Sequence, residues 1–220
     1  LIQEFQVNTT TAGPQWYPDV AMANLGDFVV AWTSDDGNGT GVFVQRFGSD
    51  GQKKGSEYRA NSYTDNNQNS ATMSMDGDGN FVVGWSSYGQ DGYLNGVFAQ
   101  MYNADGTSLG DEFQVNTTWN GKQTGPSVAM SDNLIFFTWI HVGTGIYGQC
   151  FTTMGVKIGD EFLIHDTTSG APDVAMNNQG HAIVTWRGGN DGDEYGIYAR
   201  RYASCNTVGE IFRVNTTTAH

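Results

Sequence analysis

The chain has 220 residues, of which 38% are hydrophobic, and a formal net charge of -13. That length can bury a core as one domain, and we take residues 1–220 as a single repeat domain. The 10 Lys and Arg residues are outnumbered by 23 Asp and Glu residues, so the charge argues against a nucleic-acid partner. No run of about 18 apolar residues is present, so the sequence predicts no membrane span.

One motif, written Glu-Phe-Gln-Val-Asn in its first copy, returns along the chain at a period of about 50 residues. Its five copies start at Glu4, Glu57, Glu112, Glu161 and Ile211. Such a period indicates a repeat architecture. We divide the chain into units at about 9–61, 62–116, 117–165 and 166–215, with residues 1–8 as an extra edge strand.

Each unit divides into four short strands by its turn signals and its alternating pattern. In the first unit these are residues 18–23, 28–32 and 41–47, followed by a strand around Tyr58. The Pro-x-Val-Ala-Met segments, such as the one at Pro18, are expected to be innermost, and Trp32 and its counterparts to fill the core. The sequence therefore predicts an all-β fold, a β-propeller-like array of four units with four antiparallel strands each.

The number of Glu-Phe-Gln-Val-Asn copies exceeds the number of units by one. Phe5 and Phe212 would therefore compete for one sheet edge. Three explanations are open: the chain is part of a longer array, two chains combine eight blades in one ring, or the spare strand pairs with the next molecule in a dimer or filament.

Two kinds of residue bear on the cellular setting. Cys150 and Cys205 lie in successive repeats and form either a disulfide between two blades or two buried thiols. Glycosylation sequons begin at Asn8, Asn38, Asn116 and Asn215, where the alternative is an Asn that ends a strand and forms a turn. The start at Leu1 rather than Met suggests a mature or excised segment, and the composition of the chain favours an extracellular or cell-surface location.

The loops expected on one face of the propeller combine aromatic rings with Asp and Asn side chains. Sugars are recognised by such pairs, because a ring packs on the pyranose and carboxylates bond its hydroxyl groups. The candidate sugar-binding residues are Trp16, Tyr63, Trp119, Asp36, Asp91 and Asp191. The alternative is that these loops are rich in Asp and Asn only because turns are.

Calcium is the candidate cofactor, because some acidic residues stand at every second position and hard cations such as Ca²⁺ bind oxygen ligands. The candidate ligands are Asp191, Asp193 and Glu194, in a loop long enough to wrap an ion. The run from Asp76 to Asn80 has a similar pattern, but it fits a Gly-rich hairpin turn better.

Signals for catalysis are sparse. The histidines show no metal-binding spacing, and no nucleophile elbow or phosphate-binding Gly loop is present. A glycosidase needs two facing carboxylates, which this many acids could supply by chance. The sequence therefore predicts no enzyme.

The run from Phe81 to Gly92, continued by 96–106 and 110–116, resembles the tandem repeats of large secreted or surface-attached bacterial proteins. Many of those also carry cadherin-like or RTX-type calcium-binding modules. The resemblance implies an extracellular adhesive or structural role. We therefore expect a non-catalytic adhesion or surface-assembly module that self-associates through its edge strand; the alternatives are a lectin binding glycans and, more distantly, a glycoside hydrolase.

Overall fold

The computed structural model describes residues 4–166, 170–189 and 195–216. In that part of the chain all regular structure is β-strand, so the prediction of an all-β fold is confirmed. None of the described residues forms a helix that could cross a membrane.

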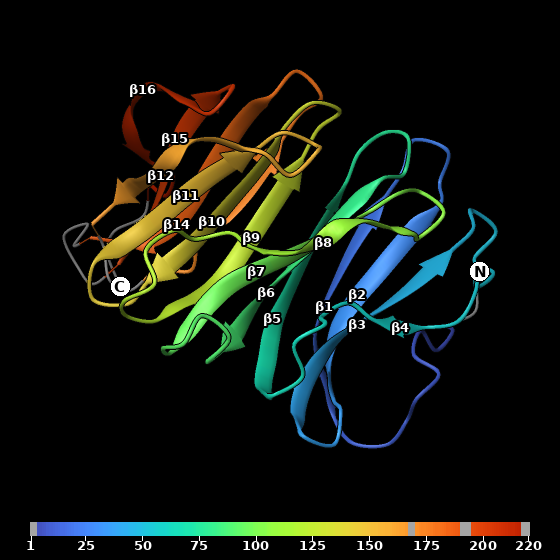
Figure 1. Ribbon diagram of the computed structural model, residues 1–220. Helices are drawn as coiled ribbons and strands as arrows, with labels where there is room; N and C mark the ends of the chain where they lie inside the picture. The colour runs from blue at the N-terminus through green and yellow to red at the C-terminus, as the bar shows by residue number, and fades with distance from the viewer. Residues whose placement is uncertain (1–3, 167–169, 190–194, 217–220) are drawn as a thin grey trace.

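The strands form four consecutive sets, which we call blades 1 to 4 (Figure 1). Blade 1 contains β1 (Gln15–Met22), β2 (Phe28–Asp35), β3 (Gly39–Phe47) and β4 (Tyr58–Arg59), and blade 2 contains β5 (Asn66–Met75), β6 (Phe81–Tyr88), β7 (Asn95–Tyr102) and β8 (Ser108–Gln114). Blade 3 contains β9 (Gln123–Met130), β10 (Ile135–His141), β11 (Gly145–Phe151) and β12 (Lys157–His165), and blade 4 contains β13 (Asp173–Met176), β14 (His181–Gly188), β15 (Gly196–Ala203) and β16 (Asn206–Arg213).

Within each blade, successive strands pair antiparallel from the first strand to the fourth. A short parallel bridge, Gly39 with Asn66 and Thr40 with Asn67, joins blades 1 and 2 into one eight-stranded sheet. The prediction of four-stranded units is therefore correct, but no closed ring forms among the described residues. Blade 4 and blade 1 stand at opposite ends of the row in Figure 1.

The middle strands of blades 2 and 3 are apolar on both faces because each face meets another blade, whereas in β14 of blade 4 only alternate side chains are buried. In β2, Val29 and Ala31 belong to the cluster shared with blade 2, whereas Val30 and Trp32 face the other way. The tryptophan near the end of each second strand is buried: Trp85, Trp139 and Trp186 lie in the clusters between blades, and Trp32 packs with Val7 on the face of blade 1 that points away from blade 2. Its exposed fraction is 5% at Trp32 and 0% at Trp85. The expectation that these tryptophans form the core is confirmed.

Residues 4–8 do not form the extra edge strand that the sequence predicted. They make no ladder with the described strands, and Phe5 and Val7 lie instead on the outer face of blade 1, against Phe47 and its neighbours. The fourth strand of blade 4 is β16, so Phe5 and Phe212 do not compete for one edge. The physical reason is that residues 4–8 lack a third strand with which to pair.

The structure joins Cys150 and Cys205 in a disulfide, with their Cα atoms 6.4 Å apart. Cys150 lies at the end of β11, and Cys205 lies in the turn between β15 and β16. The bond therefore ties the outer part of blade 4 to blade 3.

Candidate active site

The first strands of the blades, β1, β5, β9 and β13, are neighbours around the inside of the array, and side chains connect them. The carboxylate of Asp19 on β1 accepts a hydrogen bond from the Met73 amide on β5 (2.7 Å). Ser74 on β5 accepts from the Met130 amide on β9 (2.9 Å), and Ser127 on β9 accepts from the Val174 amide on β13 (3.2 Å). Polar side chains are therefore built into the inner strands, where apolar ones would be expected in a sealed core.

Two of these inner positions carry acids, Asp19 in blade 1 and Asp173 in blade 4. Both are the second residue of the Pro-Asp-Val-Ala-Met segment, and Ser127 stands there in blade 3. Asp173 Oδ1 accepts from the Ser127 hydroxyl (2.8 Å) and from its own Val174 amide (3.0 Å). The remaining oxygen, Oδ2, has no hydrogen-bond partner among the described residues.

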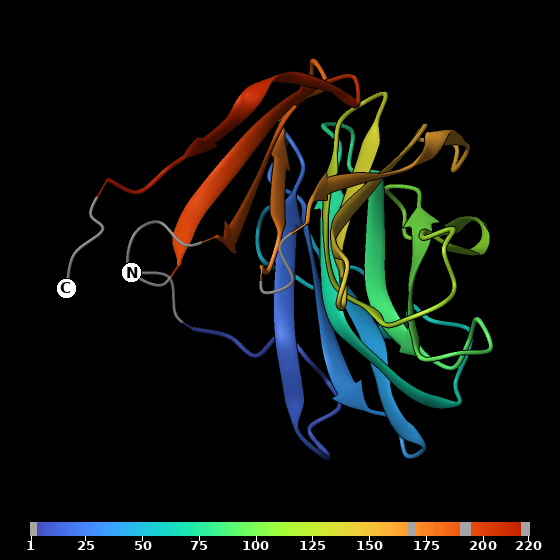
Figure 2. The same cartoon turned by 90° about the vertical axis from the view of Figure 1, so that its left-hand side faces the viewer.

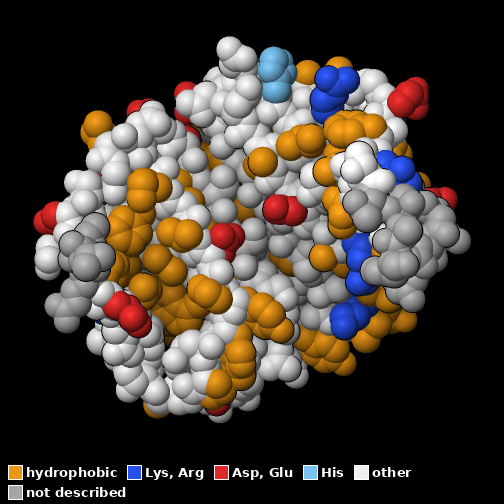
Figure 3. Space-filling model, turned by 180° about the vertical axis from the view of Figure 1, so that it is seen from behind, with side chains coloured by type: hydrophobic (Ala, Val, Ile, Leu, Met, Phe, Trp, Pro, Cys, Tyr) orange, Lys and Arg blue, Asp and Glu red, His pale blue; other side chains and the backbone are white. Residues whose placement is uncertain are grey.

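Both oxygens of Asp19 are already acceptors, since Oδ1 accepts from the Val20 amide (2.8 Å) and Oδ2 from Met73. Two backbone amides therefore hold the Asp19 carboxyl group in a fixed orientation. Seen from behind the array, acidic side chains lie near the middle of a hollowed face (Figure 3). Asp19 is half-buried and Asp173 is exposed.

The inner strands share an irregular backbone just before these positions. Pairing between β1 and β2 shifts register between Trp16 and Asp19, and pairing between β5 and β6 shifts in the same way. Tyr17 (φ 51°) and Ser70 (φ 56°) adopt the left-handed region there, and Gly125 (φ 60°) takes the third equivalent place. A non-glycine residue in that region costs about 1–3 kcal/mol. Bulges that re-aim side chains are frequent beside active sites.

Aromatic rings stand next to the first of these bulges. The exposed fractions of Trp16 and Tyr17 are 42% and 61%. A small cavity of ≈ 150 Å³ lies between Trp16, Trp32 and the N-terminal segment, with amide groups from Asn8 and Gln15. An indole beside two amides offers the mixture of flat apolar surface and hydrogen-bonding groups that a sugar ring needs.

Two of the acids predicted to bind sugar have partners within the chain. Asp36 accepts from the Asn38 amide (3.1 Å) and pairs with Arg59 (3.4 Å), and its side chain is only 3% exposed. Asp91, its counterpart in blade 2, accepts from the Tyr93 amide (3.1 Å) and lies 3.5 Å from the Gln114 amide nitrogen. Both acids therefore brace the loop between the second and third strands against the fourth strand.

The aromatic residues predicted to bind sugar lie on different blades. Tyr63 is half-buried in the loop before β5, whereas Trp119 is 61% exposed before β9. Trp119 meets Tyr93 of blade 2 edge to face, with ring centroids 6.2 Å apart. Tyr93 was not predicted, although its place in an Asp-rich loop could have suggested it. Asp191 lies outside the described residues.

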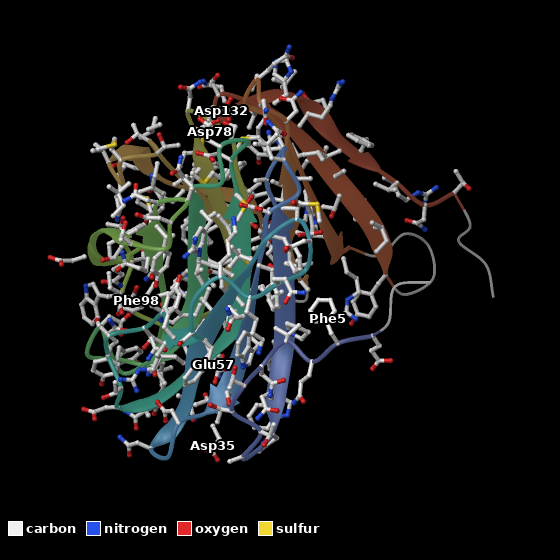
Figure 4. All side chains as sticks on the ribbon, turned by 90° about the vertical axis from the view of Figure 1, so that its right-hand side faces the viewer. Phe5, Asp35, Glu57, Asp78, Phe98 and Asp132 are labelled. Carbon is white, nitrogen blue, oxygen red and sulfur yellow. A yellow bond between two sulfur atoms is a disulfide. The ribbon has the colours of Figure 1, made fainter. Side chains whose placement is uncertain are left out.

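The structure describes none of the predicted calcium ligands, since Asp191, Asp193 and Glu194 all lie outside the described residues. Within the described ranges, no group of three or more His, Cys, Asp and Glu side chains could hold a metal ion. Asp76 accepts from the Asn80 amide (2.8 Å) and side chain (2.8 Å), as in a hairpin turn. Its neighbour Asp78 lies beside Asp132, at the end of the molecule opposite Asp35 (Figure 4).

The asparagines of the sequons cap strands. Asn116 is 2% exposed, accepts from the Val97 amide (2.8 Å) and donates to the Thr118 carbonyl (2.8 Å). A glycan on Asn116 is incompatible with this folded arrangement. Asn215 accepts from Ile197 in the same way, and the side-chain nitrogens of Asn8 and Asn38 donate to the Thr10 and Thr64 carbonyls.

Asp19 and Asp173 are not among the residues predicted from the sequence, because the Pro-x-Val-Ala-Met segments indicate only small-residue inner strands. The signal was present in the sequence. An acid stands after the proline in two of the three copies, on a strand expected at the centre of the array.

No family model matches the chain, and no curated protein resembles it in sequence. Solved structures do share its fold. A protein of unknown function from Dyadobacter fermentans matches with a TM-score of 0.64 and 10% identity, covering 91% of this chain and 68% of that one. An endo-arabinase from Bacteroides thetaiotaomicron matches with a TM-score of 0.58 and 15% identity, covering 97% of this chain and 85% of that one. The catalytic domain of a Coprinopsis cinerea GH62 α-L-arabinofuranosidase matches with a TM-score of 0.55 and 9% identity, covering 89% and 67%.

At these identities the likeness establishes the fold alone, which is that of β-propeller glycoside hydrolases. It nevertheless overturns two predictions made from the sequence. The prediction of a non-catalytic adhesion or surface-assembly module, and with it the prediction of no enzyme, is wrong, because the characterised proteins with this fold point to an enzyme.

Proposed function

We propose that this chain is the propeller of a glycoside hydrolase and that Asp19 and Asp173 are its catalytic pair. The observation that carries the proposal is that the inner strands present these two carboxyl groups at equivalent repeat positions. Glycoside hydrolysis requires two carboxyl groups on either side of the scissile bond. An arabinose-containing polysaccharide is the proposed substrate class, which is supported by structural neighbours that include an endo-arabinase and an α-L-arabinofuranosidase.

The hydrogen bonds divide the two roles. Asp19 accepts at both oxygens and is the base or nucleophile, because it is held as a fixed acceptor. Asp173 keeps Oδ2 available for a proton and is the general acid that protonates the departing oxygen. Ser127 is a positioning residue, since its hydroxyl orients the Asp173 carboxyl group.

Trp16 and Tyr17 are proposed to hold the sugar ring next to Asp19. The positive φ of Tyr17 turns the backbone at this point, and both rings are exposed. We also propose an extracellular setting, which the disulfide between Cys150 and Cys205 supports, because such bonds persist in oxidising compartments.

The test is release of reducing sugars from arabinan, arabinoxylan, xyloglucan and β-1,2-mannan. The wild-type chain should hydrolyse at least one of them, and Asp19→Asn should lower the rate by at least about a hundredfold. Asp132→Asn is the matched control, because Asp132 lies in a hairpin away from the proposed pair. Equal rates in all three proteins, or activity that Asp19→Asn does not change, would refute the assignment.

A further inference from the structure

The open space between blade 4 and blade 1, bordered by the exposed side chains of Ile197 and Val20, is here called the wedge. We propose that the wedge receives a fifth unit of three strands from the same polypeptide, and that residues 4–8 are the fourth strand of that unit. The inference is independent of the enzymatic activity. It rests on how residues 4–8 dock and on which apolar faces stay open.

In β4, β8 and β12 an aromatic ring of the fourth strand packs on the blade that follows it. Tyr58 lies 5.7 Å from Tyr102 between ring centroids, and Phe113 lies 5.3 Å from Phe151. Phe162 lies 6.0 Å from Tyr202. Phe5 holds the same relation to Phe47 of blade 1, at 5.6 Å. Phe5 therefore occupies the place of a fourth-strand residue in a blade that precedes blade 1.

A second contact repeats at the same junctions. Glu112 accepts from the Ser62 amide (2.5 Å), and Glu161 accepts from the Thr117 amide (2.5 Å). In each case the glutamate belongs to the next blade and the amide follows the motif asparagine. Glu57 accepts from Thr9 (2.5 Å) and Thr10 (2.9 Å) in the same way. Residues 4–10 thus make both of the contacts that recur between a fourth strand and the following blade.

The missing partner can be identified from the motif asparagine. Asn61 and Asn116 accept from the Val42 and Val97 amides, near the start of their own third strands. Asn8 Oδ1 meets only the Gln6 side chain (3.4 Å) among the described residues. The unit that fits must therefore supply strands one to three and leave the fourth place empty.

The face of blade 4 that would meet this unit is open. Ile197 is 41% exposed, whereas its counterparts Val42, Val97 and Ile146 are each 0% exposed. Beside it, a groove of ≈ 530 Å³ is lined by apolar side chains that include Met176, Ile183 and Val208. On the other side of the wedge, Val20 of blade 1 is 60% exposed, against 5% for Val128.

A second copy of the chain does not fit the wedge in this way. Its blade 4 carries its own fourth strand, β16, which would take the place that residues 4–8 hold on blade 1. In Figure 2 the segment leading from residue 4 and strand β16 lie on the same side of the molecule. Asn61 and Asn116 each end a copy of the motif, just before the chain enters the first strand of the next blade. Asn215 has the same place after β16, so a unit that follows it would enter the wedge directly.

In the experiment, a second copy of residues 64–103, which contain β5, β6 and β7, is appended after Thr217. Four fusions are compared: with or without residues 4–8, and with or without a C-terminal fourth strand made from residues 104–116. Melting temperature and native mass are measured beside those of the 220-residue chain. None of these readouts depends on activity, so failure here is distinguishable from failure of the proposed hydrolase.

The fusion with residues 4–8 and no C-terminal fourth strand should be monomeric and should melt more than about 5 °C above the 220-residue chain. Moving the fourth strand to the C-terminus should give the same gain, and having both should add nothing further. The proposal would be overturned if the fusions melt no higher than the 220-residue chain. It would also be overturned if the gains in melting temperature from residues 4–8 and from the C-terminal fourth strand add up when both are present, or if the 220-residue chain is already a stable oligomer through the wedge.

Discussion

Equivalent residues of the repeat differ sharply in burial between the closed junctions and the open wedge. Ile146 at the junction of blades 3 and 4 is fully enclosed, whereas Ile197 at the same repeat position on the wedge is 41% exposed. Val128 and Val20 show the same contrast on the inner strands. The residue types are almost the same, so the presence of a neighbouring blade, and not the local sequence, decides what each contributes to stability.

Truncation at these positions should sharpen the comparison most. Ile146→Ala removes a side chain packed on all sides and should lower the free energy of unfolding by about 2–5 kcal/mol. Ile197→Ala should change it by less than about 1 kcal/mol in the 220-residue chain, because the side chain is already partly in water. Denaturant unfolding of the two variants measures both, and equal losses would mean that the wedge is closed.

The disulfide compensates blade 4 for having only one neighbour. Replacing both Cys150 and Cys205 by Ser should cost about 2–4 kcal/mol, because the bond closes a loop of 55 residues. Hydrogen exchange should then show faster opening in β14 to β16 than in β5 to β8. Uniform acceleration in blades 2 and 4 would argue against this account.

The motif asparagines give a smaller contrast. Asn116→Ala leaves the buried Val97 amide without an acceptor and should cost about 1–3 kcal/mol. Asn8→Ala should cost less than about 0.5 kcal/mol, since no third strand depends on it. Thermal melts of the two variants test this, and a large effect of Asn8→Ala would contradict the docking described for residues 4–8.

The smallest effect concerns pH. Burial acts to raise the pKa of Glu57, but the hydrogen bonds from Thr10 and Thr9 outweigh it and hold the pKa below its usual value of 4.5. Because the folded-state pKa is lowered, the stabilisation is present above pH 4.5 and is lost as the pH falls through the folded value. Fluorescence from a probe at Gln6→Cys should report release of residues 4–8 in that range, and Glu57→Gln should abolish the transition.

The sequence predicts the repeat, the four strands per blade and the tryptophan core because each depends on local pattern. Trp85 and the Glu-Phe-Gln-Val-Asn copies mark the blades without any knowledge of their neighbours. The role of residues 4–8 could not be found in this way, since it depends on contacts of Phe5 with Phe47 and of Thr9 with Glu57, which are distant in the chain.

The proposed catalytic pair differs from the residues predicted from the sequence to bind sugar. Asp36 and Asp91 fit that prediction because they are loop acids beside aromatic residues, and in the structure both contact a side chain of the fourth strand. Asp19 and Asp173 lie on strands whose apolar residues suggested only packing. Their significance follows from the meeting of β1, β5, β9 and β13 at the centre of the array, which is a property of the tertiary structure.

The most direct test exchanges Asp173 for the residue that the repeat itself uses in blade 3. Asp173→Ser should keep the melting temperature within about 2 °C of the wild type, because the position is exposed, and should lower the initial rate of polysaccharide hydrolysis by at least about a hundredfold. A variant that folds like the wild type and hydrolyses the same substrate at the same rate would contradict the assignment of the inner-strand acids as the catalytic pair.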